Sequence, residues 1–217
     1  MPKPDYAAEH KKALRANAAA IPAQVLAGDA NLKKKIANFA ERHGYTVDEV
    51  LKKIKKDPMF AAHFAVDPSR QNLYETIAAR YIGALPLVND FKKLHNGALS
   101  VLQGAVMSKK ELDKQGGTSR AKTIDFAWDT CGKQIYASHK YTRDEGGAQD
   151  NQYGDIQQFI REARDSTLKN TIFLAIVDGP YYEGARLSVL KSLANNRNVF
   201  AMSIDELPRW LKSICKK

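Results

Sequence analysis

A continuous apolar run over residues 171–177 constrains the fold of this chain more than any other segment. The run is rich in β-branched residues, which is typical of a strand covered on both faces. Helical patterns flank it, over 148–168 and 185–194, and a further strand pattern follows over 199–203. Because strands joined through helices pair in parallel, these residues predict an α/β fold with helices on both faces of the sheet.

The first half of the chain has a different character. Residues 6–56 are dominated by Ala, Lys and Leu and read as helices, and 71–82 carries a clear helical repeat of apolar residues. We therefore expect an N-terminal helical region, 1–66, and an α/β core, 67–217.

The middle of the chain contains the remaining strand patterns. A short apolar run over 98–102 predicts a strand, and the polar stretch 109–122 predicts a loop. Two alternating runs, 123–130 and 134–141, are separated by a short turn and predict a β-hairpin. The core should therefore begin with one helix, three strands, a second helix and a fourth strand.

The charge of the chain favours a polyanionic partner. Lys and Arg number 34 against 24 Asp and Glu, which gives a net charge of +10. An excess of this size is common in proteins that bind nucleic acid.

The sequence also carries signals of location. No stretch approaches the 18 apolar residues that a membrane span needs, and the N-terminus lacks the apolar core of a signal peptide. The two cysteines, Cys131 and Cys215, suggest a reducing compartment. We therefore expect no membrane partner and a cytoplasmic protein.

The predicted hairpin brings polar residues together among apolar ones. With a turn at 132–133, Asp125 faces Lys140; with a turn at 131–132, Asp125 faces Ser138. Either two-residue turn puts these three side chains on one face, because side chains alternate along a strand. A three-residue turn would separate them. Polar groups at such a position are costly unless they are paired or bind a metal.

These residues carry a family resemblance. Thr123-Ile-Asp-Phe, with twelve residues between Asp125 and Ser138 and then Ser-His-Lys140, resembles the site of the PD-(D/E)xK nuclease superfamily, and type II restriction endonucleases most closely. The resemblance covers about residues 71–204. It implies a restriction-endonuclease-like three-layer α/β/α sandwich with a mixed central sheet, and Mg²⁺-dependent cleavage of double-stranded DNA at a short sequence.

Two positions depart from the family motif. Ile124 replaces its proline, and Ser138 replaces its second acidic residue. Some members with this second change take the missing carboxylate from the following helix, where three acids are candidates: Asp150, Asp155 and Glu162. That helix also carries Gln149 and Tyr153 at a spacing found in some members, which implies a catalytic role for Gln149 and a DNA contact for Tyr153.

The resemblance also assigns roles at the site. Asp125 and the main-chain carbonyl of His139 would bind Mg²⁺, which favours oxygen ligands. Lys140 would orient the attacking water and offset negative charge at the phosphate. Glu75, on the preceding helix, resembles an extra metal-binding acid, and ion pairing with a neighbouring arginine is an equally good interpretation.

The resemblance also implies DNA and a second copy of the chain as partners. Four basic residues before Asp125 are candidate DNA contacts: Lys109, Lys110, Arg120 and Lys122. Short palindromic sites are usually cut by two-fold dimers, so we expect a homodimer. Two alternatives stay open. One is a DNA-repair or junction-resolving nuclease of the same fold, and the other is a non-catalytic nucleic-acid-binding protein with a degenerate site, which Ser138 favours.

Overall fold

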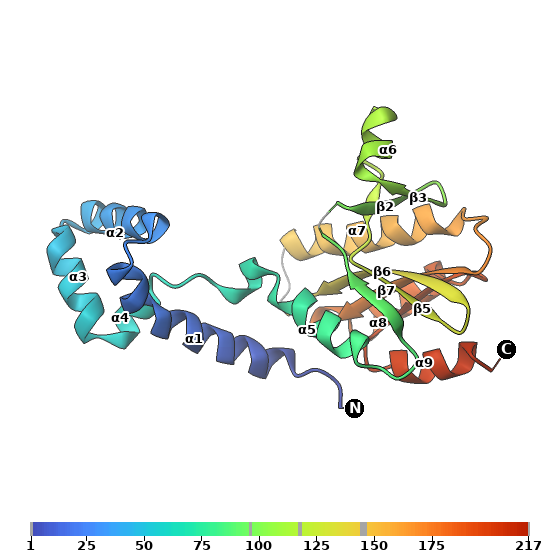
Figure 1. The fold of residues 1–217 in the computed structure, drawn as a ribbon, viewed down its shortest axis with the longest axis horizontal. Coiled ribbons are helices and arrows are strands. Elements are labelled where there is room, and N and C mark those ends of the chain that lie inside the picture. Colours follow the sequence, from blue (N-terminus) through green and yellow to red (C-terminus); the bar gives the residue numbers. More distant parts are fainter. Residues whose placement is uncertain (1, 96, 117–118, 144–146, 217) are drawn as a thin grey trace. The chain divides into compact units, whose positions relative to one another are not determined.

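The computed structural model describes residues 2–95, 97–116, 119–143 and 147–216, with the backbone alone at 70, 71 and 147–149. The chain divides into two compact units, Asp5–Leu73 and Tyr74–Lys217, the second also taking in Met1–Pro4 (Figure 1). The boundary expected from the sequence, 66/67, lies seven residues earlier, ahead of a short 3₁₀ helix that belongs to the first unit.

The first unit is helical, as the sequence predicts for 6–56. Its core contains Ile36, Ile54 and Phe64, all nearly inaccessible to solvent. A Thr46–Glu49 capping box begins the third helix, since each side chain bonds the other residue's backbone N–H. The helices are α1 (Tyr6–Leu26), α2 (Ala30–His43), α3 (Val47–Lys56), α4 (Pro58–Ala62) and the 3₁₀ helix η1 (Pro68–Gln71).

The second unit is an α/β structure built on a mixed five-stranded sheet. Its elements are α5 (Leu73–Gly83), β1 (Asn89–Lys93), β2 (Leu99–Leu102), β3 (Ala105–Ser108), α6 (Lys109–Lys114), β4 (Lys122–Thr123), β5 (Phe126–Thr130), β6 (Lys133–Tyr141), α7 (Gly147–Arg164), β7 (Thr171–Asp178), η2 (Pro180–Tyr182), α8 (Ala185–Leu193), β8 (Val199–Met202) and α9 (Leu207–Ile214).

The large sheet has the strand order β1-β5-β6-β7-β8. The first three strands pair antiparallel, and β6, β7 and β8 pair in parallel through the helices α7 and α8. The parallel pairing predicted from the run at 171–177 is confirmed, and all eight residues of β7 are buried. Helices lie on both faces of this sheet (Figure 1).

A second, smaller sheet corrects one part of the sequence prediction. The strand expected at 98–102 is β2, which pairs with β3 and β4 in a separate three-stranded sheet. The edge of the large sheet is instead β1, a mostly exposed strand of sequence Asn-Asp-Phe-Lys-Lys that carries no apolar signal. The loop expected at 109–122 contains α6, which begins with a Ser108–Glu111 capping box.

The β5–β6 hairpin turns at Cys131 and Gly132. Both residues have positive φ, 50° and 75°, the combination of a type I′ turn. Thr130 pairs with Lys133 and Phe126 pairs with Ala137, so Asp125 faces Ser138. Of the two registers that the sequence left open, the structure has the second.

The two cysteines are joined by a disulfide. Cys131 lies in the hairpin turn and Cys215 follows α9, and their Cα atoms are 5.5 Å apart. The cysteine pair therefore no longer supports a reducing compartment, because disulfides persist mainly in oxidising environments. No local sequence pattern predicts this pairing, because 84 residues separate the two positions.

Candidate functional site

Asp125 lies where the chain crosses from the small sheet to the large one. Its backbone is held on two sides, because its N–H donates to the Ala137 carbonyl at 2.8 Å and its own carbonyl accepts from the Leu94 N–H at 2.8 Å. The run 123–130, expected as one strand, is divided here between β4 and β5. The crossing fixes the position of the carboxylate at the beginning of β5.

The Asp125 carboxylate is bound by two neighbours on β6. Its Oδ2 accepts hydrogen bonds from the Ser138 hydroxyl at 3.1 Å and from the His139 N–H at 2.7 Å. Asp125 and Ser138 are both buried, at 9% and 4% exposure. Ser138 therefore acts as a donor to Asp125, where an acidic residue would have repelled it.

Lys140 follows Ser138 on the same face of β6. Both residues line a cavity of about 200 Å³, together with residues of β4 and α7. Ser138 and Lys140 share one face of β6 and line this cavity, and the hydrogen bond from Ser138 places the Asp125 carboxylate on the same side, as the sequence predicts. Among the described residues, no carboxylate lies within ion-pair distance of Lys140, so its ammonium group is available to a ligand.

His139 points to the opposite face of the sheet. Its side chain is 4% exposed, and its Nε2 lies 3.3 Å from Oδ2 of Asp178 at the end of β7. Its backbone is on the Asp125 side, because the His139 N–H donates to that carboxylate. The N–H and C=O of one strand residue point to the same side, so the His139 carbonyl that the resemblance assigns to a metal also lies toward Asp125.

Asp178 was missed as a functional candidate. In the sequence, Asp178 directly follows the apolar run 171–177 and precedes Gly179-Pro180, a pattern that predicts only the end of a strand. Its Oδ1 also accepts from the Ile204 N–H at 3.0 Å, so it links β7 to the chain after β8. The available signal was its place at the carboxyl end of a parallel strand, where α/β proteins often bind ligands.

The structure separates the three candidate replacement acids on α7. Asp155 lines the cavity with Lys140, and its Oδ1 lies 2.6 Å from the Lys122 ammonium group. Asp150 accepts a hydrogen bond from the Tyr181 hydroxyl at 2.7 Å. Glu162 is 1% exposed and is held away from this cavity by Gln103, Gln158 and Arg120. Only Asp155, of the three, lines the cavity.

Glu162 has a structural role. Its carboxylate accepts from the Gln103 N–H at 2.8 Å, from Gln158 at 2.6 Å and from Arg120 at 3.1 Å. Burial acts to raise the pKa of Glu162, but these hydrogen bonds and the charge of Arg120 outweigh it, so the pKa lies below its usual value. The contacts tie the β2–β3 turn to α7.

Replacing Glu162 by Ala is expected to lower the free energy of unfolding by about 2 kcal/mol, because it leaves buried donors without an acceptor. Asp155→Ala removes a half-exposed ion pair and should change stability by less than about 0.5 kcal/mol. Urea unfolding of both variants measures the difference. Equal stabilities would contradict the structural role of Glu162.

Other predicted site residues lie apart from this cluster. Glu75 lies 3.2 Å from the Lys93 ammonium group. Lys93 pairs with Phe126, the residue after Asp125, so Lys93 and Asp125 point to opposite faces of the sheet. The ion-pair interpretation of Glu75 is therefore the better one, with Lys93 in place of arginine. The Gln149 side chain lies outside the described part of the structure.

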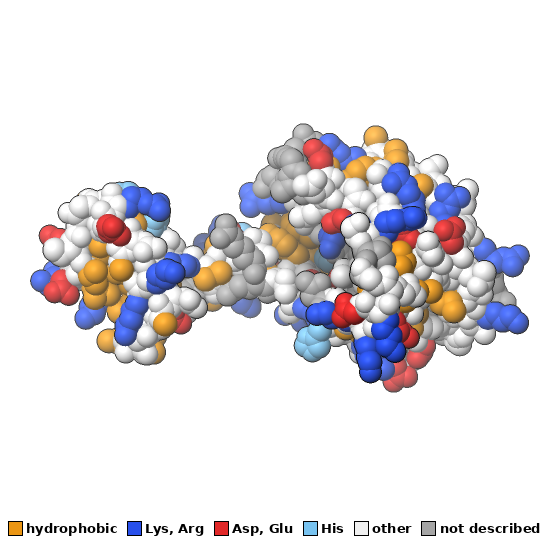
Figure 2. Space-filling model, turned by 90° about the horizontal axis from the view of Figure 1, so that it is seen from above, with side chains coloured by type: hydrophobic (Ala, Val, Ile, Leu, Met, Phe, Trp, Pro, Cys, Tyr) orange, Lys and Arg blue, Asp and Glu red, His pale blue; other side chains and the backbone are white. Residues whose placement is uncertain are grey.

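The candidate DNA contacts fall into two groups. Lys109 and Lys110 are exposed at the beginning of α6. Arg120 forms an ion pair with Glu162, and Lys122 forms one with Asp155. Figure 2 shows that basic side chains are spread over the visible face of this unit, with acidic ones between them.

Tyr153 is largely a packing residue. Its ring lies against those of Tyr181 and Tyr182, and its hydroxyl donates to the Arg186 carbonyl at 3.4 Å. Its side chain is half-buried beside the core of the α7 face. The DNA contact implied for it stays a prediction.

The donor set fits a weakly held Mg²⁺ better than a protein-enclosed one. No group of three or more His, Cys, Asp or Glu side chains suited to a metal occurs among the described residues. Mg²⁺ often takes only one or two carboxylates and completes its shell with water and substrate phosphate. Asp125, the His139 carbonyl and the exposed Asp155 are oxygen donors of this kind.

Comparisons with known proteins assign no family to the chain. No family model matches it, and no curated protein matches it. Among solved structures, it is similar to protein VC1899 from Vibrio cholerae, with 11% sequence identity and a TM-score of 0.31. The match covers the whole of this chain and spans 57% of the length of that one. None of the helices within the described ranges is long and apolar enough to cross a membrane.

Proposed function

We propose that the α/β unit is a metal-dependent nuclease that hydrolyses phosphodiester bonds in DNA. The observation that carries this proposal is a buried carboxylate, Asp125, bonded to Ser138, which lines a cavity together with the cationic Lys140. A scissile phosphate needs oxygen ligands for a metal and a nearby positive charge, and this cluster offers both.

The order of elements supports the same proposal. A helix, α5, is followed by the antiparallel strands β1, β5 and β6, then by α7 and the parallel strand β7. This order resembles the core expected for the PD-(D/E)xK superfamily, with the small sheet as an insertion between β1 and β5. The aspartate lies immediately before the second of these strands and the lysine toward the end of the third.

Each residue of the candidate site has a distinct role in the proposed hydrolysis. Asp125 and the His139 carbonyl would hold Mg²⁺, with Asp155 as a further oxygen donor from α7. The ion, when bound, supplies an activated water and charge compensation at the leaving oxygen. Ser138 positions the Asp125 carboxylate through its hydrogen bond. Lys140 orients the attacking water and offsets charge on the phosphate.

A second candidate function is a non-catalytic DNA-binding protein. Ser138, which stands in place of the second acidic residue of the nuclease motif, favours it. The basic net charge suits both candidates equally.

Incubation with supercoiled plasmid should separate the candidates. We expect nicked or linear DNA with Mg²⁺ or Mn²⁺ and none with EDTA. Discrete fragments would support a homodimeric type II restriction enzyme, and a smear would support a non-specific nuclease. Preferential cutting of a four-way junction would support a junction-resolving enzyme. Intact DNA that is retarded in a gel would contradict the nuclease and support the binding protein.

A further inference from the structure

Two more cavities continue from the candidate site toward the amino-terminal ends of β7 and β8. The nearer one, of about 690 Å³, is lined by α7 residues, Arg120 and Asn196. The farther one, of about 810 Å³, lies between the segments 166–170 and 196–198 and shares Asn196 with the first. Arg120 is two residues from Lys122, which lines the cavity of Lys140. The nearer cavity therefore follows the candidate site along α7, and the farther one lies beyond the end of this helix.

The lining of these two cavities is strongly basic. Two acidic side chains occur in it, Glu162 and Asp165, and Glu162 is bound to Arg120. Six basic side chains line them: Arg120, Arg161 and Arg164 in the nearer cavity, and Lys133, Lys169 and Arg197 in the farther one. This is the charge pattern that tracks a phosphate backbone.

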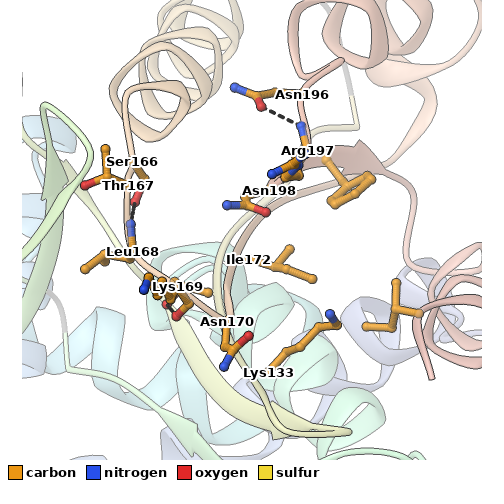
Figure 3. A pocket seen from close by; sticks show the side chains of 13 residues that line it. Lys133, Ser166, Thr167, Leu168, Lys169, Asn170, Ile172, Asn196, Arg197 and Asn198 are labelled. Carbon is orange, nitrogen blue, oxygen red and sulfur yellow. Dashed lines mark hydrogen bonds between the residues drawn. The ribbon is translucent and has the colours of Figure 1, made fainter. Parts of the chain in front are cut away.

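The farther cavity also offers surfaces suited to a nucleotide. Figure 3 shows Asn196, Arg197 and Asn198 across the cavity from 166–169, with Lys133 at one end. Ile172 and Phe200 add apolar surface to its lining, on which a base could rest. Asparagine amides can bond base edges, and the lysines and arginine can bond phosphate.

The distance from the candidate site to the farther cavity suits a short stretch of nucleic acid. Lys133 lines the farther cavity and Lys140 lines the candidate site, seven residues apart on β6. At roughly 3.3 Å per residue, the two sites are about 23 Å apart along the strand. Because seven is an odd spacing, Lys133 and Lys140 point to opposite faces of the sheet, so a bound strand would pass round the amino-terminal ends of β7 and β8. A DNA strand advances about 3.4 Å per nucleotide, so at least roughly seven nucleotides would be needed.

We propose that these two cavities form a track for a DNA strand, which leaves the candidate site along α7 and ends between 166–170 and 196–198. The inference rests on the proposed function, because the track begins at the cavity that holds Lys140. It adds a binding surface that none of the predicted DNA contacts except Arg120 touches.

The test compares two double variants with equal loss of charge. Lys169→Ala with Arg197→Ala removes two track residues, and Arg209→Ala with Lys212→Ala removes two exposed charges on α9. Binding of fluorescent duplexes of about 8 and about 20 base pairs is measured in EDTA by anisotropy. We expect the track variant to bind the longer duplex at least about 10-fold more weakly, with the salt slope reduced by about 2. The control should bind like the wild type.

The outcomes separate this inference from the nuclease proposal. Wild-type binding of the longer duplex by the track variant would overturn the track, whether or not plasmid is cut. Weakened binding together with uncut plasmid would leave the track standing and remove the nuclease. Both altered side chains are exposed, so thermal unfolding should match the wild type, and Lys169→Gln with Arg197→Gln provides a second version of the test.

Discussion

Replacing Asp125 by Asn, or Lys140 by Met, is expected to lower the rate of DNA cleavage by at least about 100-fold. Asn keeps the size of Asp125 and one acceptor for the bonds from Ser138 and His139, but it removes the negative charge that a metal needs. Met keeps the length of Lys140 and removes the cation beside the phosphate. Both variants should fold, because neither leaves a cavity.

The measurement is the rate of plasmid cleavage at saturating Mg²⁺, with duplex binding followed in parallel. Asp129→Asn is the matched control for the carboxylate, since it lies on the same strand but opposite Gln134, near the turn. Lys212→Met is the control for the cation. Binding should survive in all four variants. Wild-type cleavage by Asp125→Asn or Lys140→Met would remove that residue from the chemistry.

Opening the Cys131–Cys215 disulfide is expected to lower the free energy of unfolding by about 4.5 kcal/mol. The bond closes a loop spanning 84 residues, and the chain-entropy estimate for a loop of this size is close to that value. For a domain of this length the thermal midpoint should fall by about 10 °C. The loop contains β6, α7 and β7, so Ser138, Lys140 and Asp155 lie within it, whereas Asp125 precedes it.

Thermal and urea unfolding of the oxidised protein, the reduced protein and Cys131→Ser with Cys215→Ser give the comparison. The reduced protein and the double variant should agree with each other and differ from the oxidised protein. Equal midpoints for the oxidised and reduced forms would contradict a stabilising disulfide. A free-thiol assay on the untreated protein establishes which form is purified.

The strand pattern of the core was largely predictable. Residues 171–177 are apolar without interruption, and this by itself indicates a strand buried on both faces. The alternation along 134–141 placed Ser138 and Lys140 on one face. The register of the hairpin depends on which two residues form its turn, and the sequence is compatible with two such turns. The structure therefore decides that Ser138, and not Lys140, lies opposite Asp125.

Other features had no local signal. β1 is mostly polar and exposed, because an edge strand beside solvent needs no apolar alternation. The three acids of α7 look alike in sequence, and only packing against β2 and β4 turns Glu162 to the β2–β3 turn and Asp155 to the cavity.

The sequence by itself determined the α/β class, the parallel crossovers and the shared face of Asp125, Ser138 and Lys140, because periodicity and strand alternation are local properties of the chain. Only the tertiary structure decided that Asp155 lines the site, that Cys131 meets Cys215, and that a basic cavity lies beside α7 with a second one beyond the end of this helix. These depend on contacts between segments far apart in the chain, and no local pattern records which distant surfaces will pack together.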